Sequence, residues 1–136
     1  MKIRKFSMKH YEEAMKIWKK TGLTITPSDD KKGIKIMIKR NPKLCLVGIM
    51  DKNVVATVMG GFDGRKGYVH HLAVDPALQK KGFGKTMLSE LIKRFKRMNV
   101  YKIHLFVEKE SSHVLDFYLK LGWEMRNDLI MMSFVP

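Results

Sequence analysis

Hydrophobic residues in the first part of the chain recur at a helical spacing. Between residues 7 and 21 they return every three or four positions, which predicts an amphipathic helix. Its buried face is expected to hold Tyr11, Ala14, Met15, Ile17 and Trp18. Gly22 ends this helix. Ser28 is a suitable cap for a second helix, with acids in its first turn, that ends before Pro42.

The rest of the chain alternates β-rich runs with two further helices. The predicted strands are residues 3–6, 44–50, 54–61, 68–74, 102–107, 123–126 and 130–135. The predicted helices are residues 82–98, with Met87, Leu88, Leu91, Ile92 and Phe95 buried, and residues 111–121, which Gly122 stops. The order β-α-α-β-β-β-α-β-α-β-β indicates a mixed sheet with a right-handed parallel crossover over residues 68–107.

The turn that joins the strand at 68–74 to the helix at 82–98 carries the clearest chemical signal. It combines two glycines with three lysines: Gly82, Gly84, Lys80, Lys81 and Lys85. Backbone N–H groups at a helix start, with the helix dipole behind them, form an anion site that glycine leaves open. The segment predicts a phosphate or pyrophosphate cradle at the carboxyl end of a strand. The spacing fits neither the Walker loop nor the three-glycine dinucleotide motif, and a turn that needs glycine only for backbone freedom is the alternative.

Composition narrows the class of protein. A chain of 136 residues, 45% hydrophobic and 29% charged, predicts one domain over residues 1–136, with no membrane span and no signal peptide, and hence a cytoplasmic location. The one cysteine, Cys45, lies in an apolar run and is expected to be a buried thiol. The five histidines form no ligand pattern, so no metal site is expected. The net charge of +14 fits either a solvated basic surface or an attraction for anions such as a phosphorylated cofactor, an acidic substrate or RNA.

Two motifs are spaced around the predicted crossover, the first within it and the second after it. The first is Leu72-Ala73-Val74-Asp75-Pro76 followed by Gln79-Lys80-Lys81-Gly82-Phe83-Gly84, and the second is Val114-Leu115-Asp116-Phe117-Tyr118-Leu119-Lys120-Leu121-Gly122-Trp123. With both motifs and the element order, the whole chain resembles the GNAT superfamily of acetyl-CoA-dependent N-acetyltransferases. Within it, residues 58–69 resemble the short YpeA-like members, with the protein alanine N-acetyltransferases as near relatives.

The resemblance implies a fold, a cosubstrate and a reaction. The fold would be α/β (α+β): a mixed, mostly antiparallel sheet of six to seven strands, with a splayed central parallel pair and helices on both faces. Acetyl-CoA would be the cosubstrate, its pyrophosphate held by the amides of Gln79, Lys80, Lys81, Gly82, Phe83, Gly84 and Lys85, and its pantetheine arm paired with Leu72, Ala73 and Val74. The acetyl group would pass by direct attack to a primary amine of a protein N-terminus, an amino acid or a small amine. The protein would act as a monomer or homodimer, without a membrane or nucleic-acid partner.

The resemblance also assigns catalytic roles. Tyr118 matches the family's tyrosine and would protonate the departing thiolate, although packing within its helix is the alternative. Phe106 stands where relatives carry a glutamate that helps to deprotonate the amine. Glu108, His70, His71 and a water chain are the candidate bases that remain, and the two adjacent histidines are expected on opposite faces of their strand.

Ser111 stands where many family members use asparagine to contact the cofactor arm. Capping of the helix that carries Tyr118 is an equally good interpretation of this serine. The missing glutamate at position 106 also leaves open a non-catalytic acyl-CoA- or RNA-binding module on the same fold. A net charge of +14 favours an anionic donor and disfavours polycationic acceptors. The acceptor, whatever its identity, is expected to bind within residues 7–39.

Overall fold

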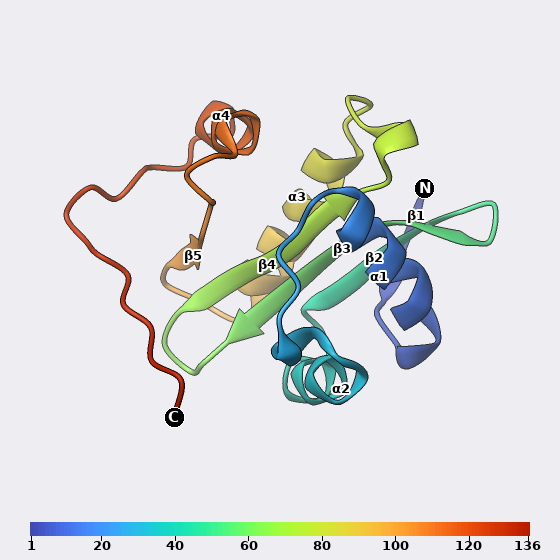
Figure 1. Ribbon diagram of the computed structural model, residues 1–136, viewed down its shortest axis with the longest axis horizontal. Coiled ribbons are helices and arrows are strands. Elements are labelled where there is room, and N and C mark those ends of the chain that lie inside the picture. Colours follow the sequence, from blue (N-terminus) through green and yellow to red (C-terminus); the bar gives the residue numbers. More distant parts are fainter. The chain divides into compact units, whose positions relative to one another are not determined.

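A five-stranded mixed sheet organises the first 105 residues, and the computed structural model describes the whole chain, residues 1–136 (Figure 1). The strands lie side by side in chain order: β1 (Lys2–Lys5), β2 (Cys45–Met50), β3 (Asn53–Phe62), β4 (Gly67–Val74) and β5 (Ile103–Leu105). The pairs from β1 to β4 are antiparallel, and β4 and β5 are parallel. The predicted mixed sheet with one parallel crossover is therefore confirmed.

The contacts divide the chain into two compact units, Met1–Leu105 and Phe106–Pro136. The first contains the sheet with α1 (Tyr11–Lys20), α2 (Lys31–Arg40) and α3 (Phe83–Arg97). The second contains α4 (Ser112–Lys120). A single domain over residues 1–136 stays a prediction.

Helices cover both faces of the sheet in the first unit, as predicted. Figure 1 shows α1 and α2 on one face and α3 on the other. The alternation of side chains along β3 explains how one strand serves both layers: Met59 packs in a cluster with Trp18 of α1, whereas the next residue, Gly60, faces α3. A Cβ on Gly60 would come within 2.6 Å of Leu91 Cδ1, so glycine lets α3 lie close to the sheet.

The first two helices start later than the sequence predicts. Residues Met8–His10 form a separate 3-10 turn, η1, so α1 begins at Tyr11 and not at residue 7. The second helix begins at Lys31, and its cap is Asp30, whose side chain accepts a 2.7 Å hydrogen bond from the Gly33 N–H. Ser28 instead lies in a separate 3-10 turn, η2 (Pro27–Asp29), so the prediction that it caps the helix was wrong. Pro27 starts this turn, and Thr26 and Asp29 close it with side-chain hydrogen bonds, so the helix begins after Asp30 and not after Ser28.

The two strands predicted at the end of the chain are absent. Residues 121–136 form no strand, and the apolar side chains from Met125 onward are exposed, 90% for Ile130 and 88% for Phe134. A β-rich run becomes a strand only where a neighbouring strand supplies its ladder partners, and these residues have none. The sheet therefore has five strands, not six to seven, and β5 covers only three residues of the predicted 102–107.

The buried cysteine is confirmed. Cys45 is 1% exposed on β2, and its Sγ lies 3.7 Å from the Gly60 carbonyl oxygen, to which the thiol donates. Burial raises the pKa of this thiol to about 12, which keeps it protonated and unreactive at neutral pH. No helix combines the length and the apolar character needed to cross a bilayer.

Candidate functional site

The turn after β4 builds an open helix start. The Gln79 side chain donates a 3.0 Å hydrogen bond from Nε2 to the Val74 carbonyl, which ties the turn to the strand. Gly82 precedes α3 with a left-handed φ of +85°, a conformation that glycine adopts without strain. The first backbone hydrogen bond of α3 runs from the Thr86 N–H to the Gly82 carbonyl, at 3.0 Å.

The amides that precede this bond point out of the helix end. Phe83, Gly84 and Lys85 lie before the first intrahelical bond, and no side chain caps α3. Lys80, Lys81 and Lys85 are all exposed around this end. The structure therefore has the geometry that the sequence predicts for an anion cradle, with the fifteen-residue α3 behind it.

Strand β4 is paired with β5 over only part of its length. The parallel ladder joins Gly67–Val69 to Ile103–Leu105 and stops there. The second half of β4, which includes Leu72, Ala73 and Val74, has no partner on its β5 side. An extended ligand could pair with this strand edge, directly before the cradle.

A β-bulge interrupts β4 just before that edge. In the ladder with β3, Thr57 lies opposite Ala73 and Met59 lies opposite His70, so β4 has one residue more than β3 in this interval. His71 lies in the bulge with a left-handed φ of +49°. Such a conformation is uncommon for a residue with a Cβ.

The bulge places both histidines of β4 on one face of the sheet. His70 shares its face with its ladder partner Met59, which packs in the cluster around Trp18, and the His71 ring contacts the Trp18 ring at 4.6 Å. The prediction that these histidines point to opposite faces was therefore wrong, because the extra residue breaks the alternation of the strand. Burial, and then the neighbouring His71, lower the pKa of His70.

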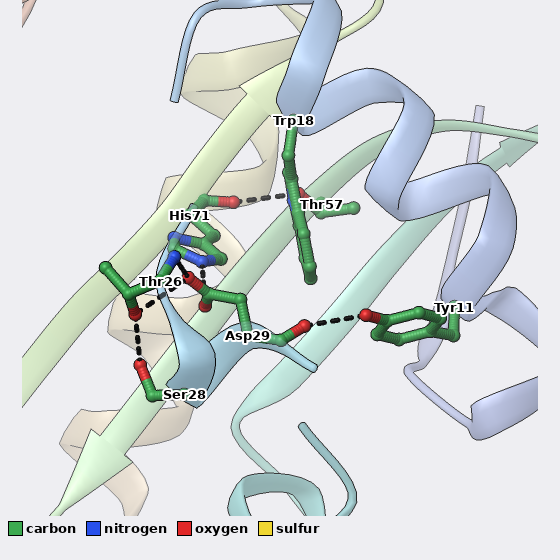
Figure 2. A network of polar contacts seen from close by, with 7 residues as sticks. All are labelled: Tyr11, Trp18, Thr26, Ser28, Asp29, Thr57 and His71. Carbon is green, nitrogen blue, oxygen red and sulfur yellow. Dashed lines mark hydrogen bonds and ion pairs between the residues drawn. The ribbon is translucent and has the colours of Figure 1, made fainter. Parts of the chain in front are cut away.

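A polar network surrounds His71 (Figure 2). His71 Nε2 lies 2.6 Å from Asp29 Oδ1, and the Asp29 residue is 6% exposed. The Thr57 hydroxyl, which is fully buried, donates to the His71 carbonyl at 2.8 Å and accepts from Trp18 Nε1 at 2.9 Å. The sequence predicts Asp29 only as an acid in the first turn of the second helix, because nothing local relates it to a histidine 42 positions away.

The remaining predicted residues belong to the second unit. Tyr118 on α4 is 8% exposed, and its ring packs edge-on against Phe117 and Trp123, with centroids 5.1 and 5.6 Å away. Burial raises the pKa of its phenol to about 12. Ser111 precedes α4 without a side-chain hydrogen bond to the helix, so the capping interpretation is not supported, and Glu108 is exposed.

No three His, Cys, Asp or Glu side chains gather in a way that could hold a metal ion. The first unit thus brings together Leu72–Val74 and Gln79–Lys85, whereas Glu108, Ser111 and Tyr118 lie in the second.

Comparisons with known proteins agree with this arrangement. The acetyltransferase (GNAT) family matches residues 8–123. An acetyltransferase of Sodalis glossinidius is 30% identical over 133 residues, which are 98% of this chain and 94% of the relative. The crystal structure of PaiA N-acetyltransferase from Thermoplasma acidophilum in complex with coenzyme A has a TM-score of 0.81 at 22% identity, covering 93% of this chain and 91% of that one. A predicted acetyltransferase from Clostridium acetobutylicum with acetyl-CoA has a TM-score of 0.72 at 20% identity, covering 97% and 95%.

The Thr57 hydroxyl generates a prediction about stability. Thr57→Val should lower the free energy of unfolding by about 2–4 kcal/mol, because it leaves Trp18 Nε1 and the His71 carbonyl without partners in the core. Thr57→Ser keeps the hydroxyl, removes one methyl group and should cost only about 1 kcal/mol. Denaturation by urea, followed by circular dichroism, measures both. Equal losses for the two variants would contradict this role of the hydroxyl.

Proposed function

The chain belongs to the acetyltransferase (GNAT) family, and we propose that it transfers the acetyl group of acetyl-CoA to a primary amine by direct attack. The observation that carries this proposal is the combination of an unpaired half-strand with an open helix start in one continuous segment, residues 70–85. The family match favours an enzyme over the non-catalytic module that the sequence left open. Among the family's branches, we propose the short YpeA-like and protein alanine N-acetyltransferase-like members as nearest.

Acetyl-CoA is the donor, and its diphosphate lies at the start of α3. The amides of Gln79, Lys80, Lys81, Gly82, Phe83, Gly84 and Lys85 supply hydrogen bonds, and the lysines supply positive charge. No atom lies within 4 Å of where a Cβ on Gly82 would stand, so the diphosphate can approach the backbone there.

The pantetheine arm extends the sheet. It pairs with Leu72, Ala73 and Val74, whose strand has no β5 partner at this point. A backbone N–H in the same stretch hydrogen-bonds the thioester carbonyl and stabilises the oxyanion that develops as the amine attacks. Ser111 contacts the cofactor arm in this proposal, a role that its lack of a capping bond favours.

Tyr118 supplies the proton for the departing thiolate. A pKa raised to about 12 keeps its phenol protonated over the working pH range, so the proton is present when the C–S bond breaks. On the acceptor side, the sequence leaves Glu108, His70, His71 and a water chain as candidate proton acceptors, and Glu108 lies two residues after Phe106.

The acceptor is a primary amine without further positive charge. A protein N-terminus or an amino acid fits a molecule of net charge +14 better than a polyamine does. Release of coenzyme A thiol from acetyl-CoA tests this with three amines: an Ala-Ala-Ala amide, glutamate and spermidine. We expect thiol release that saturates with the tripeptide or glutamate and is slower with spermidine, with the acetylated amine identified by mass spectrometry. Binding of coenzyme A with no acetylated product from any of these amines would contradict this assignment, and faster reaction of spermidine would reverse the order of acceptors.

Alanine variants of two glycines distinguish an effect on cofactor binding from an effect of backbone strain. Gly82 and Gly64 have φ values of +85° and +95°, and a Cβ on either meets no atom within 4 Å. Gly82→Ala and Gly64→Ala should therefore each cost about 1–2 kcal/mol of stability. Only Gly82→Ala should weaken coenzyme A binding, by about tenfold or more (~1.4 kcal/mol), because its Cβ meets the diphosphate. Isothermal titration calorimetry measures the affinity, and equal affinities of the two variants would place the diphosphate elsewhere.

Removal of the Tyr118 hydroxyl tests the proton donor. Tyr118→Phe keeps the ring packed against Phe117 and Trp123, so coenzyme A affinity should stay unchanged while kcat falls by about 10²-fold or more. The wild-type kcat should show no loss attributable to Tyr118 below about pH 11, since its pKa is about 12. Tyr101→Phe is the control, because Tyr101 is 80% exposed. Full turnover by Tyr118→Phe would eliminate this role.

A further inference from the structure

A histidine–aspartate pair lies directly before the part of β4 that we assign to acetyl-CoA. His71 is the residue before Leu72, and its Nε2 lies 2.6 Å from Asp29 Oδ1. The side chains are 18% and 9% exposed, so the pair is shielded but not sealed from solvent. A short contact of this kind in a partly buried site is strong, because little water competes for it.

Asp29 is held in one orientation by other hydrogen bonds. Its second carboxylate oxygen, Oδ2, accepts from the Thr26 N–H at 2.9 Å and from the Thr26 hydroxyl at 3.3 Å. Its backbone carbonyl accepts from the Tyr11 hydroxyl at 2.7 Å. Figure 2 shows these contacts converging on Asp29 from α1 and from the η2 turn, with the His71 ring on the remaining oxygen. The carboxylate is therefore a fixed acceptor that faces the histidine.

This arrangement selects one form of the imidazole ring. An ionised carboxylate only accepts hydrogen bonds, so the Nε2 atom of His71 carries the hydrogen and Nδ1 keeps its lone pair. Nδ1 makes no hydrogen bond within the protein, and no enclosed side-chain nitrogen or oxygen is without a partner, so Nδ1 is open to solvent. An accessible lone pair backed by a carboxylate is the arrangement that proton abstraction requires.

The backbone at His71 is held in an unfavourable conformation. A φ of +49° costs about 1–2 kcal/mol for a residue with a Cβ. The buried Thr57 hydroxyl fixes the His71 carbonyl, and the Trp18 ring packs against the imidazole at 4.6 Å. Strained residues that their surroundings hold in place occur preferentially at functional sites.

We propose that His71 is the general base of acetyl transfer and that Asp29 orients it and stabilises its protonated form; this rests on the acetyl transfer proposed above. The ammonium group of the acceptor gives one proton to His71 Nδ1. The freed nitrogen lone pair forms the C–N bond to the thioester carbonyl carbon, and the C–S bond breaks with its electron pair left on sulfur. Tyr118 gives its proton to the thiolate and is reprotonated by the second proton that the nitrogen loses, and His71 returns its own proton to water.

Two other residues compete for this role. His70 lies on the same face of the sheet, and Glu108 is the carboxylate that the sequence offers. The titratable groups that face His71 are Asp29 of η2, Tyr11 of α1 through the Asp29 carbonyl, and His70 of β4. Only Asp29 makes a direct hydrogen bond to the His71 ring.

The test is the pH profile of kcat/KM for acetylation of the Ala-Ala-Ala amide. His71→Gln keeps a donor for Asp29 but cannot take up a proton, so kcat/KM at pH 7 should fall by about 10²-fold and the acidic limb of the profile should disappear. Asp29→Asn should also lower kcat/KM but keep an acidic limb, because the ring keeps its basic nitrogen and loses the carboxylate that orients it. His113→Gln, the same change on an exposed residue of α4, should match the wild type. Coenzyme A affinity should be equal in all four proteins.

A second measurement needs no turnover. Long-range ¹H–¹⁵N NMR of the imidazoles should show neutral His71 with its hydrogen on Nε2, identified by the loss of its signals in His71→Asn, a residue type that tolerates a left-handed φ. Hydrogen on Nδ1 would overturn the proposal even if the glutamine variant failed to fold.

The kinetic outcomes distinguish a failure of the proposed role of His71 from a failure of the proposed acetyl transfer on which it rests. Full kcat/KM in His71→Gln, or loss of the acidic limb in His70→Gln or Glu108→Gln instead, would overturn the role of His71 and leave acetyl transfer intact. Loss of coenzyme A affinity in His71→Gln would show a structural role instead and would also overturn it. A wild-type protein that acetylates no amine would overturn the proposed function, and the role of His71 with it.

Discussion

The short ladder between β4 and β5 is the constraint on which the proposed chemistry depends. The two strands share a ladder only over Gly67–Val69 and Ile103–Leu105, so the second half of β4 has a free edge inside a folded sheet. Unpaired backbone groups are costly to bury, and a ligand that supplies the missing hydrogen bonds is favoured there. Because the same strand runs into the open start of α3, one continuous segment holds both the strand edge proposed for the pantetheine arm and the helix start proposed for the diphosphate.

The bulge at His71 connects this strand edge to α1 and the η2 turn, which lie on one face of the sheet. Through Thr57 and Asp29, the bulged residue is bonded to α1, β3 and the η2 turn, which come from well-separated parts of the chain. Each of these groups is buried or nearly so, and each would be costly to leave unpaired. The network therefore fixes the η2 turn, within the region expected to meet the acceptor, against the strand proposed to bind the donor.

Local sequence patterns predicted what local physics determines. The helical faces, the hairpin strands and the glycine–lysine turn follow from spacing and residue type, and the structure has each of them. The terminal strands were predicted wrongly, because a strand exists only if a partner is present, and Ile130 and Phe134 illustrate apolar residues without one. The pairing of His71 with Asp29 escaped notice for a related reason: an extra residue in β4 turns the ring toward a distant turn, and no periodicity reveals a bulge.

The most direct test of the central claim is a titration of coenzyme A followed by ¹H–¹⁵N NMR of the backbone amides. The account predicts saturable shifts concentrated at residues 72–74 and 79–85, where the free strand edge and the helix start meet the ligand. Saturable shifts confined to other parts of the chain, or no binding at all, would contradict it.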